Sequence, residues 1–160
     1  MSLQLSGADL LDLAIETERR GERFYRAAER AAADPGAKEL FRELADQEIA
    51  HRRTFERLGG AIVITEIDPS DWDEALAYIR ATVDSTFFAD DAPIHQVAVG
   101  PTVADMLRQA IAFEQQTLLY FSSLRDLVQP ANRPLVDQVI AEERSHVRRL
   151  AAMLKNQDAS

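Results

Sequence analysis

Cysteine is absent from this 160-residue sequence. Disulfides, thiolate metal sites, iron–sulfur clusters and cysteine nucleophiles are therefore excluded. Any metal ion must be bound by carboxylate, imidazole or water. Long apolar runs are also lacking, and no stretch approaches the ~20 residues of a membrane-spanning helix. Residues 1–7 lack a basic segment followed by an apolar one, so no signal peptide is expected and a cytoplasmic location is predicted.

Basic residues are scarce relative to acidic ones. The chain has 18 Lys and Arg against 27 Asp and Glu, which gives a net charge of -9. Nucleic-acid binding depends mainly on basic side chains that contact phosphate, so a nucleic-acid partner is not expected. Hydrophobic residues make up 46% and charged residues 28%, as in ordinary globular proteins. We therefore expect a single domain spanning residues 1–160.

Hydrophobic residues recur with the helical period in four long segments, which predicts an all-α four-helix bundle. The expected helices cover residues 7–33, 35–58, 102–128 and 133–155. Asp34 followed by Pro35 favours a short break with a new helix starting at the proline. The first two helices should therefore be antiparallel neighbours.

The connection between the second and third helices is unusually long. It contains an amphipathic segment, residues 71–87, for which we expect a short crossover helix. The second helix should be roughly 36 Å long, and the connection can return along that whole length. The third helix can therefore run parallel to the second.

Two of the expected helices carry the same short motif, a glutamate followed three residues later by a histidine. It occurs as Glu48–His51 and as Glu143–His146. Residues three apart lie on one face of a helix, about 5 to 6 Å apart at Cβ, so both side chains can reach one metal ion. A single copy is most often a solvated ion pair. The second copy and its surroundings favour a metal site.

The two halves of the chain repeat around this motif. Glu18 and Glu114 are each a lone carboxylate inside an apolar stripe, and aligning them superposes an Ala-Ile pair upstream and an aromatic pair downstream. The next motif glutamate follows 30 residues later in the first half and 29 in the second. The repeat predicts two copies of one helical hairpin, packed about a pseudo-two-fold axis with four acids at one level of the core.

Four buried carboxylates cannot all remain ionised without positive charge, since desolvation and repulsion each cost several kcal/mol. Two divalent cations would supply that charge. One glutamate from each of two helices and Glu-x-x-His from the other two is the ligand arrangement of ferritin-like di-iron and di-manganese carboxylate proteins. On these motifs the sequence resembles the ferritin-like superfamily, and within it the rubrerythrin-like branch, over nearly its full length. The resemblance is carried by Glu18 with Phe24-Tyr25, by residues 44–51, by Glu114 with Tyr120-Phe121, and by residues 142–146.

The resemblance implies a ferritin-like bundle that binds two metal ions and assigns no catalytic residue beyond the metal centre. The implied ligands are Glu18 and Glu114 as terminal ligands, Glu48 and Glu143 as bridging ligands, and His51 and His146 as one imidazole per metal. Iron is the implied metal, although manganese and zinc accept the same ligands. For Tyr25 and Tyr120 we expect core packing, with each hydroxyl bonded to a ligand carboxylate.

Departures from the related families narrow these expectations. A full rubrerythrin has a cysteine-ligated iron domain and an additional glutamate three residues after the third-helix ligand, where this chain has Thr117. Ligand switching through that glutamate is therefore not predicted. Ile49 stands where bacterioferritins carry a haem-ligating methionine, so haem is not expected. The long connection after the second helix disfavours a hollow storage shell.

The function that we expect is the reduction of peroxide or O₂ by a di-iron centre, in oxidative stress or iron metabolism. An iron-storage or ferroxidase role and a non-catalytic metal-binding bundle are the alternatives. We expect a homodimer or higher homo-oligomer that receives electrons from an external donor. Neither a nucleic acid nor a membrane is an expected partner.

Overall fold

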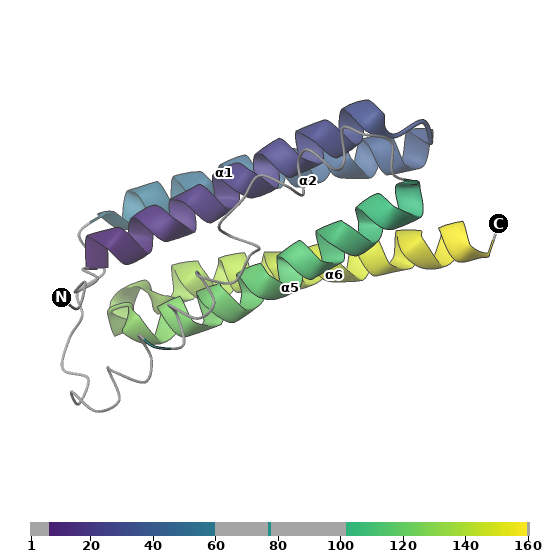
Figure 1. The fold of residues 1–160 in the computed structure, drawn as a ribbon. Helices are drawn as coiled ribbons and strands as arrows, with labels where there is room; N and C mark the ends of the chain where they lie inside the picture. Colours follow the sequence, from purple (N-terminus) through teal and green to yellow (C-terminus); the bar gives the residue numbers. More distant parts are fainter. Residues whose placement is uncertain (1–6, 60–76, 78–101, 160) are drawn as a thin grey trace.

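The computed structural model describes residues 7–59, 77 and 102–159. The helices are α1 (Gly7–Ala31), α2 (Pro35–Leu58), α5 (Val103–Leu127) and α6 (Arg133–Asp158), with a short 3-10 helix, η2 (Pro130–Asn132), before the last. They form an all-α four-helix bundle (Figure 1), and the described part of the chain contains no strand. The fold class predicted from the sequence is confirmed.

The helix boundaries lie close to those expected from the periodicity. α2 has the expected bounds, and α5 begins and ends one residue inside them. α1 ends at Ala31, two residues early, because Asp34 precedes a proline and is extended. α6 continues to Asp158, three residues beyond the expected end, because no glycine or proline interrupts its polar last turn.

Asp34 determines where α2 begins. Its side chain accepts a hydrogen bond from the backbone N–H of Ala37 at 2.7 Å. Pro35 occupies the first helical position, where the missing N–H costs no hydrogen bond. Thr102 caps α5 in the same way and accepts from the backbone N–H of Asp105 at 3.2 Å.

The helices form two antiparallel hairpins. α1 packs against α2 and α5 against α6, while α1 also contacts α5 and α2 contacts α6. α5 runs parallel to α2 (Figure 1), as the length of the intervening connection predicts. The crossover helix expected at residues 71–87 lies outside the described residues apart from Ala77. The chain therefore places two similar hairpins face to face.

A polar layer interrupts the apolar core in all four helices. One apolar cluster, which includes Leu10, Phe55 and Phe121, lies toward the start of α1. The other, which includes Phe41 and Leu107, lies toward its end. In every helix the buried glutamates and histidines fall between the residues of these two clusters. Among the described residues, no helix is long and apolar enough to cross a membrane.

Replacing Asp34 by alanine should lower the free energy of unfolding by about 1 kcal/mol, because the N–H of Ala37 loses its acceptor. Asp34→Asn is the matched control, since its amide oxygen can accept the same hydrogen bond, and it should cost only a few tenths of a kcal/mol. Urea unfolding followed by circular dichroism measures both variants. An equal loss in the two would contradict the capping role.

Candidate metal centre

All six residues that the sequence predicts as metal ligands lie in the polar layer. They are Glu18 on α1, Glu48 and His51 on α2, Glu114 on α5, and Glu143 and His146 on α6. Each of them is at most 1% exposed. The helical period explains this placement, because every one of these residues falls in the apolar stripe that its helix turns inward.

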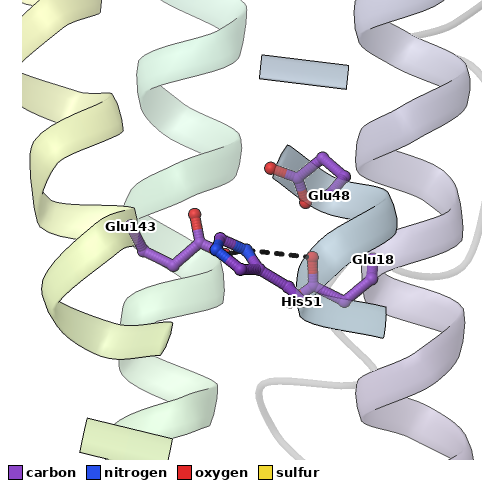
Figure 2. Close-up of side chains that lie close together, drawn as sticks. All are labelled: Glu18, Glu48, His51 and Glu143. Atoms are coloured by element: carbon purple, nitrogen blue, oxygen red, sulfur yellow. Dashed lines mark hydrogen bonds and ion pairs between the residues drawn. The ribbon is translucent and has the colours of Figure 1, made fainter. Parts of the chain in front are cut away.

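The ligand atoms of these residues form two overlapping groups. One group contains Glu18, Glu48, His51 and Glu143, the other contains Glu48, Glu114, Glu143 and His146, and within each group the atoms lie within 4.8 Å of one another. Figure 2 shows the side chains of the first group, which converge from α1, α2 and α6. Glu48 and Glu143 belong to both groups, which is the arrangement that two bridging carboxylates require.

Both imidazole rings direct Nδ1 into the layer. Nδ1 of His51 lies 3.0 Å from Oε1 of Glu143 and 3.7 Å from Oε2 of Glu18. Nδ1 of His146 lies 2.8 Å from Oε2 of Glu143 and 3.3 Å from Oε1 of Glu114. The two rings stack with their centroids 5.5 Å apart. Nδ1 is therefore the nitrogen of each histidine that faces the buried carboxylates.

The opposite ring nitrogens contact two residues to which sequence reasoning assigned no role. Nε2 of His51 lies 2.7 Å from Oε2 of Glu142, and Nε2 of His146 lies 2.6 Å from Oε1 of Gln47. Each partner comes from the other hairpin and immediately precedes a motif glutamate. Contacts of this kind set the orientation and tautomer of a metal-binding imidazole. Their shared position in the repeat is the signal that could have identified them.

Most carboxylate oxygens in the layer form no hydrogen bond. Within the described residues, neither oxygen of Glu18 or of Glu48 has a hydrogen-bond partner, nor does Oε2 of Glu114. Leaving a buried polar atom unpaired costs about 1–3 kcal/mol, so such atoms are rare. Oxygens that converge with imidazole nitrogens and lack donors are suited to cations. The residues present therefore fit a pair of divalent metal ions.

Burial dominates the ionisation of the carboxylates in the metal-free layer. Desolvation raises the pKa of Glu18, Glu48 and Glu114 well above the ordinary value, and repulsion from Glu143 raises it further. Burial also acts to raise the pKa of Glu143, but hydrogen bonds from the two imidazoles outweigh it, and the net pKa is lowered. Without metal, the layer holds protons in place of cations.

The imidazoles supply positive charge to the metal-free layer. Burial alone would lower the pKa of both rings. The hydrogen bond to Glu143 and the charge of that carboxylate reverse this effect and raise the pKa of His51 to about 9. Hydrogen bonds to Glu114 and Glu143 raise the pKa of His146 well above its ordinary value. Metal binding must displace these protons.

The two tyrosines of the repeat have different partners. Tyr25 donates a hydrogen bond to Oε1 of Glu114, as expected. The hydroxyl of Tyr120 instead donates to the backbone carbonyl of Leu10 at 2.6 Å, so the expectation was wrong for Tyr120. The reason is the order of the aromatic pair, which is Phe-Tyr in α1 and Tyr-Phe in α5. A shift of one residue turns the side chain by about 100° around the helix.

Different residues follow Glu18 and Glu114 by one helical turn in the two hairpins. In α5 this residue is Thr117, whose hydroxyl is buried and has no hydrogen-bond partner among the described residues. In α1 it is Gly21, where an added Cβ atom would lie 2.6 Å from Oε2 of Glu48 and 3.1 Å from Cε1 of Phe113. The absence of a side chain at Gly21 therefore leaves room for the Glu48 carboxylate.

Gly21→Ala should reduce the metal content of the protein while its helicity is retained, because the new methyl group displaces the carboxylate of Glu48. In an ordinary helix the same change stabilises by about 0.5–1 kcal/mol. Gly36→Ala is the control, since its Cβ would meet no atom closer than 3.3 Å and lies far from the layer. Elemental analysis after reconstitution measures the effect. Full metal content in Gly21→Ala would contradict the steric argument.

The metal-free protein should lose stability between about pH 6 and about pH 9. The pKa of His51 is raised from 6.5 to about 9, so the folded state binds this proton more tightly than the unfolded state. The resulting stabilisation is complete below pH 6.5 and is lost as the pH rises through 9, about 3 kcal/mol at 1.36 kcal/mol per pKa unit. The raised pKa of Glu18 acts in the same direction, from pH 4.5 upward.

Urea unfolding of chelator-treated protein at the two pH values measures this loss. Metal-reconstituted protein is the comparison, because metal ions require deprotonated ligands and should stabilise the fold more at the higher pH. A metal-free stability that stayed constant or rose over this interval would show that the layer does not hold the protons assigned to it.

Comparisons with known proteins agree with this site. The family model for rubrerythrin matches residues 9–95. A solved structure from Thermotoga maritima, described as a ferritin-like diiron-carboxylate protein, is 28% identical with a TM-score of 0.71, over 98% of this chain and 99% of that chain. No curated protein matches the chain significantly. The buried carboxylate and imidazole groups and these matches support the binding of two metal ions, and the chain belongs to the rubrerythrin family.

Proposed function

We propose that this protein is a di-iron oxidoreductase that reduces peroxide or O₂. The observation that carries the proposal is the pair of overlapping ligand groups that share Glu48 and Glu143. Membership of the rubrerythrin family and the diiron-carboxylate description of the Thermotoga maritima relative favour iron over manganese or zinc. When bound, two ferrous ions supply the two electrons that, with two protons, convert hydrogen peroxide into two molecules of water.

The residues of the layer would offer each of the two ions the same types of ligand, three carboxylates and one imidazole. The proposed bridging ligands are Glu48 and Glu143, and the terminal ligands are Glu18 with Nδ1 of His51 on one side and Glu114 with Nδ1 of His146 on the other. Four carboxylates balance the charge of two divalent ions. The imidazoles are neutral when metal is bound, because their Nδ1 protons must leave.

The surrounding residues restrict what can enter the site. The apolar clusters on either side of the layer exclude bulk water, and no proposed ligand is more than 1% exposed. Only a small substrate such as peroxide or O₂ suits such a site. Tyr25 holds a proton next to Oε1 of Glu114, and Thr117 provides a second buried hydroxyl one turn from the same ligand.

Anaerobic protein loaded with Fe²⁺ tests the proposal when it is mixed with hydrogen peroxide. We expect oxidation of two ferrous ions per peroxide, followed by repeated turnover when an external reductant is added. Metal binding without peroxide or O₂ consumption would favour a non-catalytic bundle. Oxidation of many ferrous ions per chain, together with a large hollow assembly in light scattering, would favour iron storage.

Glu143→Ala should abolish binding of both ions, whereas Glu18→Ala should leave one, because Glu143 belongs to both ligand groups and Glu18 to one. Glu39→Ala is the control, since Glu39 is exposed on α2 and pairs only with Arg42 among the described contacts. Metal analysis and circular dichroism together report the metal content and the retained helicity. Two full metal ions in Glu143→Ala would show that the ligand assignment is wrong.

A further inference from the structure

The two imidazoles are oriented by groups of different charge. Nε2 of His51 is held by the carboxylate of Glu142 at 2.7 Å, and Nε2 of His146 by the amide oxygen of Gln47 at 2.6 Å. Glu142 and Gln47 occupy the same position of the repeated motif, immediately before a bridging glutamate. The pseudo-symmetry of the bundle is therefore broken at the atoms that support the two imidazoles.

This difference changes the strength of the imidazoles as ligands. With Nδ1 facing the metal, Nε2 carries the proton and donates it in a hydrogen bond to the supporting oxygen. A carboxylate accepts a stronger, charge-assisted bond than an amide and transfers more electron density to the ring. His51 is therefore the stronger donor. The carboxylate of Glu142 is also held in place, because Nε2 of Gln138 donates to its other oxygen at 3.1 Å.

A second difference between the halves acts in the same direction. Oε1 of Glu114 accepts the hydrogen bond of Tyr25, which draws electron density away from that carboxylate. Among the described residues, neither oxygen of Glu18 has a hydrogen-bond partner. The residue that corresponds to Tyr25 in the other half is Phe121, whose ring packs on Phe55 with centroids 4.8 Å apart. Glu18 is therefore the stronger of the two terminal carboxylate donors.

We propose that the two metal positions are inequivalent, so that the position of Glu18 and His51 binds a metal ion more tightly and fills first. The position of Glu114 and His146 is the weaker one and exchanges its ion with solution. Glu142 and Gln47 act as positioning residues that set this order. The inference rests on the proposed dinuclear site, and it adds an order of filling that the family match does not supply.

Isothermal titration of the metal-free protein with Co²⁺ measures the two dissociation constants. We expect two steps that differ by at least about 10-fold, in line with the 10- to 100-fold effect of groups that support metal-binding histidines. Crystals grown with one equivalent of Co²⁺ should show anomalous scattering beside Glu18 and His51. Equal occupancy of the two positions, or a first ion beside Glu114 and His146, would overturn the inference.

Two nearly isosteric substitutions should reduce the difference between the two dissociation constants, one by weakening the first step and the other by tightening the second. Glu142→Gln should weaken the first step by about 10-fold and bring the two constants together. Gln47→Glu should tighten the second step by a similar factor and also bring them together. A residue with a purely structural role could not produce tighter binding when it is replaced. Constants that change by less than twofold in both variants would overturn the assignment to Glu142 and Gln47.

Two further variants separate local effects from general ones. Glu39→Gln removes one negative charge from the exposed face of α2 and should leave both constants unchanged, which excludes an effect of net charge alone. Tyr25→Phe should tighten only the second step, by a few-fold, because Glu114 regains electron density. Absence of any Co²⁺ binding would refute the dinuclear site itself, whereas two equal constants in the parent protein would refute only the inequivalence.

Discussion

The desolvation of four carboxylates in the middle of a helical core is the constraint on which the rest of the structure depends. Most of their oxygens accept no hydrogen bond that would offset the loss of hydration. Neighbouring like charges also raise the energy of the ionised state. In the metal-free protein, protons bound to three carboxylates and to both imidazoles reduce the negative charge of the layer. When two divalent ions are bound, their positive charge allows the carboxylates to be ionised and the imidazoles to be neutral. Metal binding, proton release and stability are therefore linked.

The packing around the layer follows from this constraint. Apolar clusters on both sides keep water out, so any compensating charge has to be bound within the layer. Gly21 leaves the volume that the carboxylate of Glu48 occupies. The two hairpins exchange supporting contacts, because Glu142 holds His51 and Gln47 holds His146. Each hairpin therefore depends on the other for the geometry of its histidine, which makes the site a property of the whole bundle.

Helices and inward-facing residues could be predicted because both depend on local periodicity. A glutamate in an apolar stripe, such as Glu18, must face the core wherever the helix packs. The pairing of the hairpins could also be predicted, since the repeat and the lengths of the connections limit the possible arrangements. Side-chain contacts around the proposed ligands are harder to predict from the sequence. The predicted partner of Tyr120 was wrong, because the reversed order of its aromatic pair turns the side chain by about 100° around the helix. Gln47 and Glu142 were given no role, because each contacts an imidazole of the other hairpin.

The all-α fold, the two hairpins and the six residues that face one level of the core can be read from the sequence, because each of these follows from helical period and repeat spacing. The folded structure was needed to show which ligand atoms converge and which polar group supports each imidazole. These contacts join residues of different helices, and the ligand atoms of each group lie within 4.8 Å of one another. Distances of that size are set by how the helices pack, and no single helix contains that information.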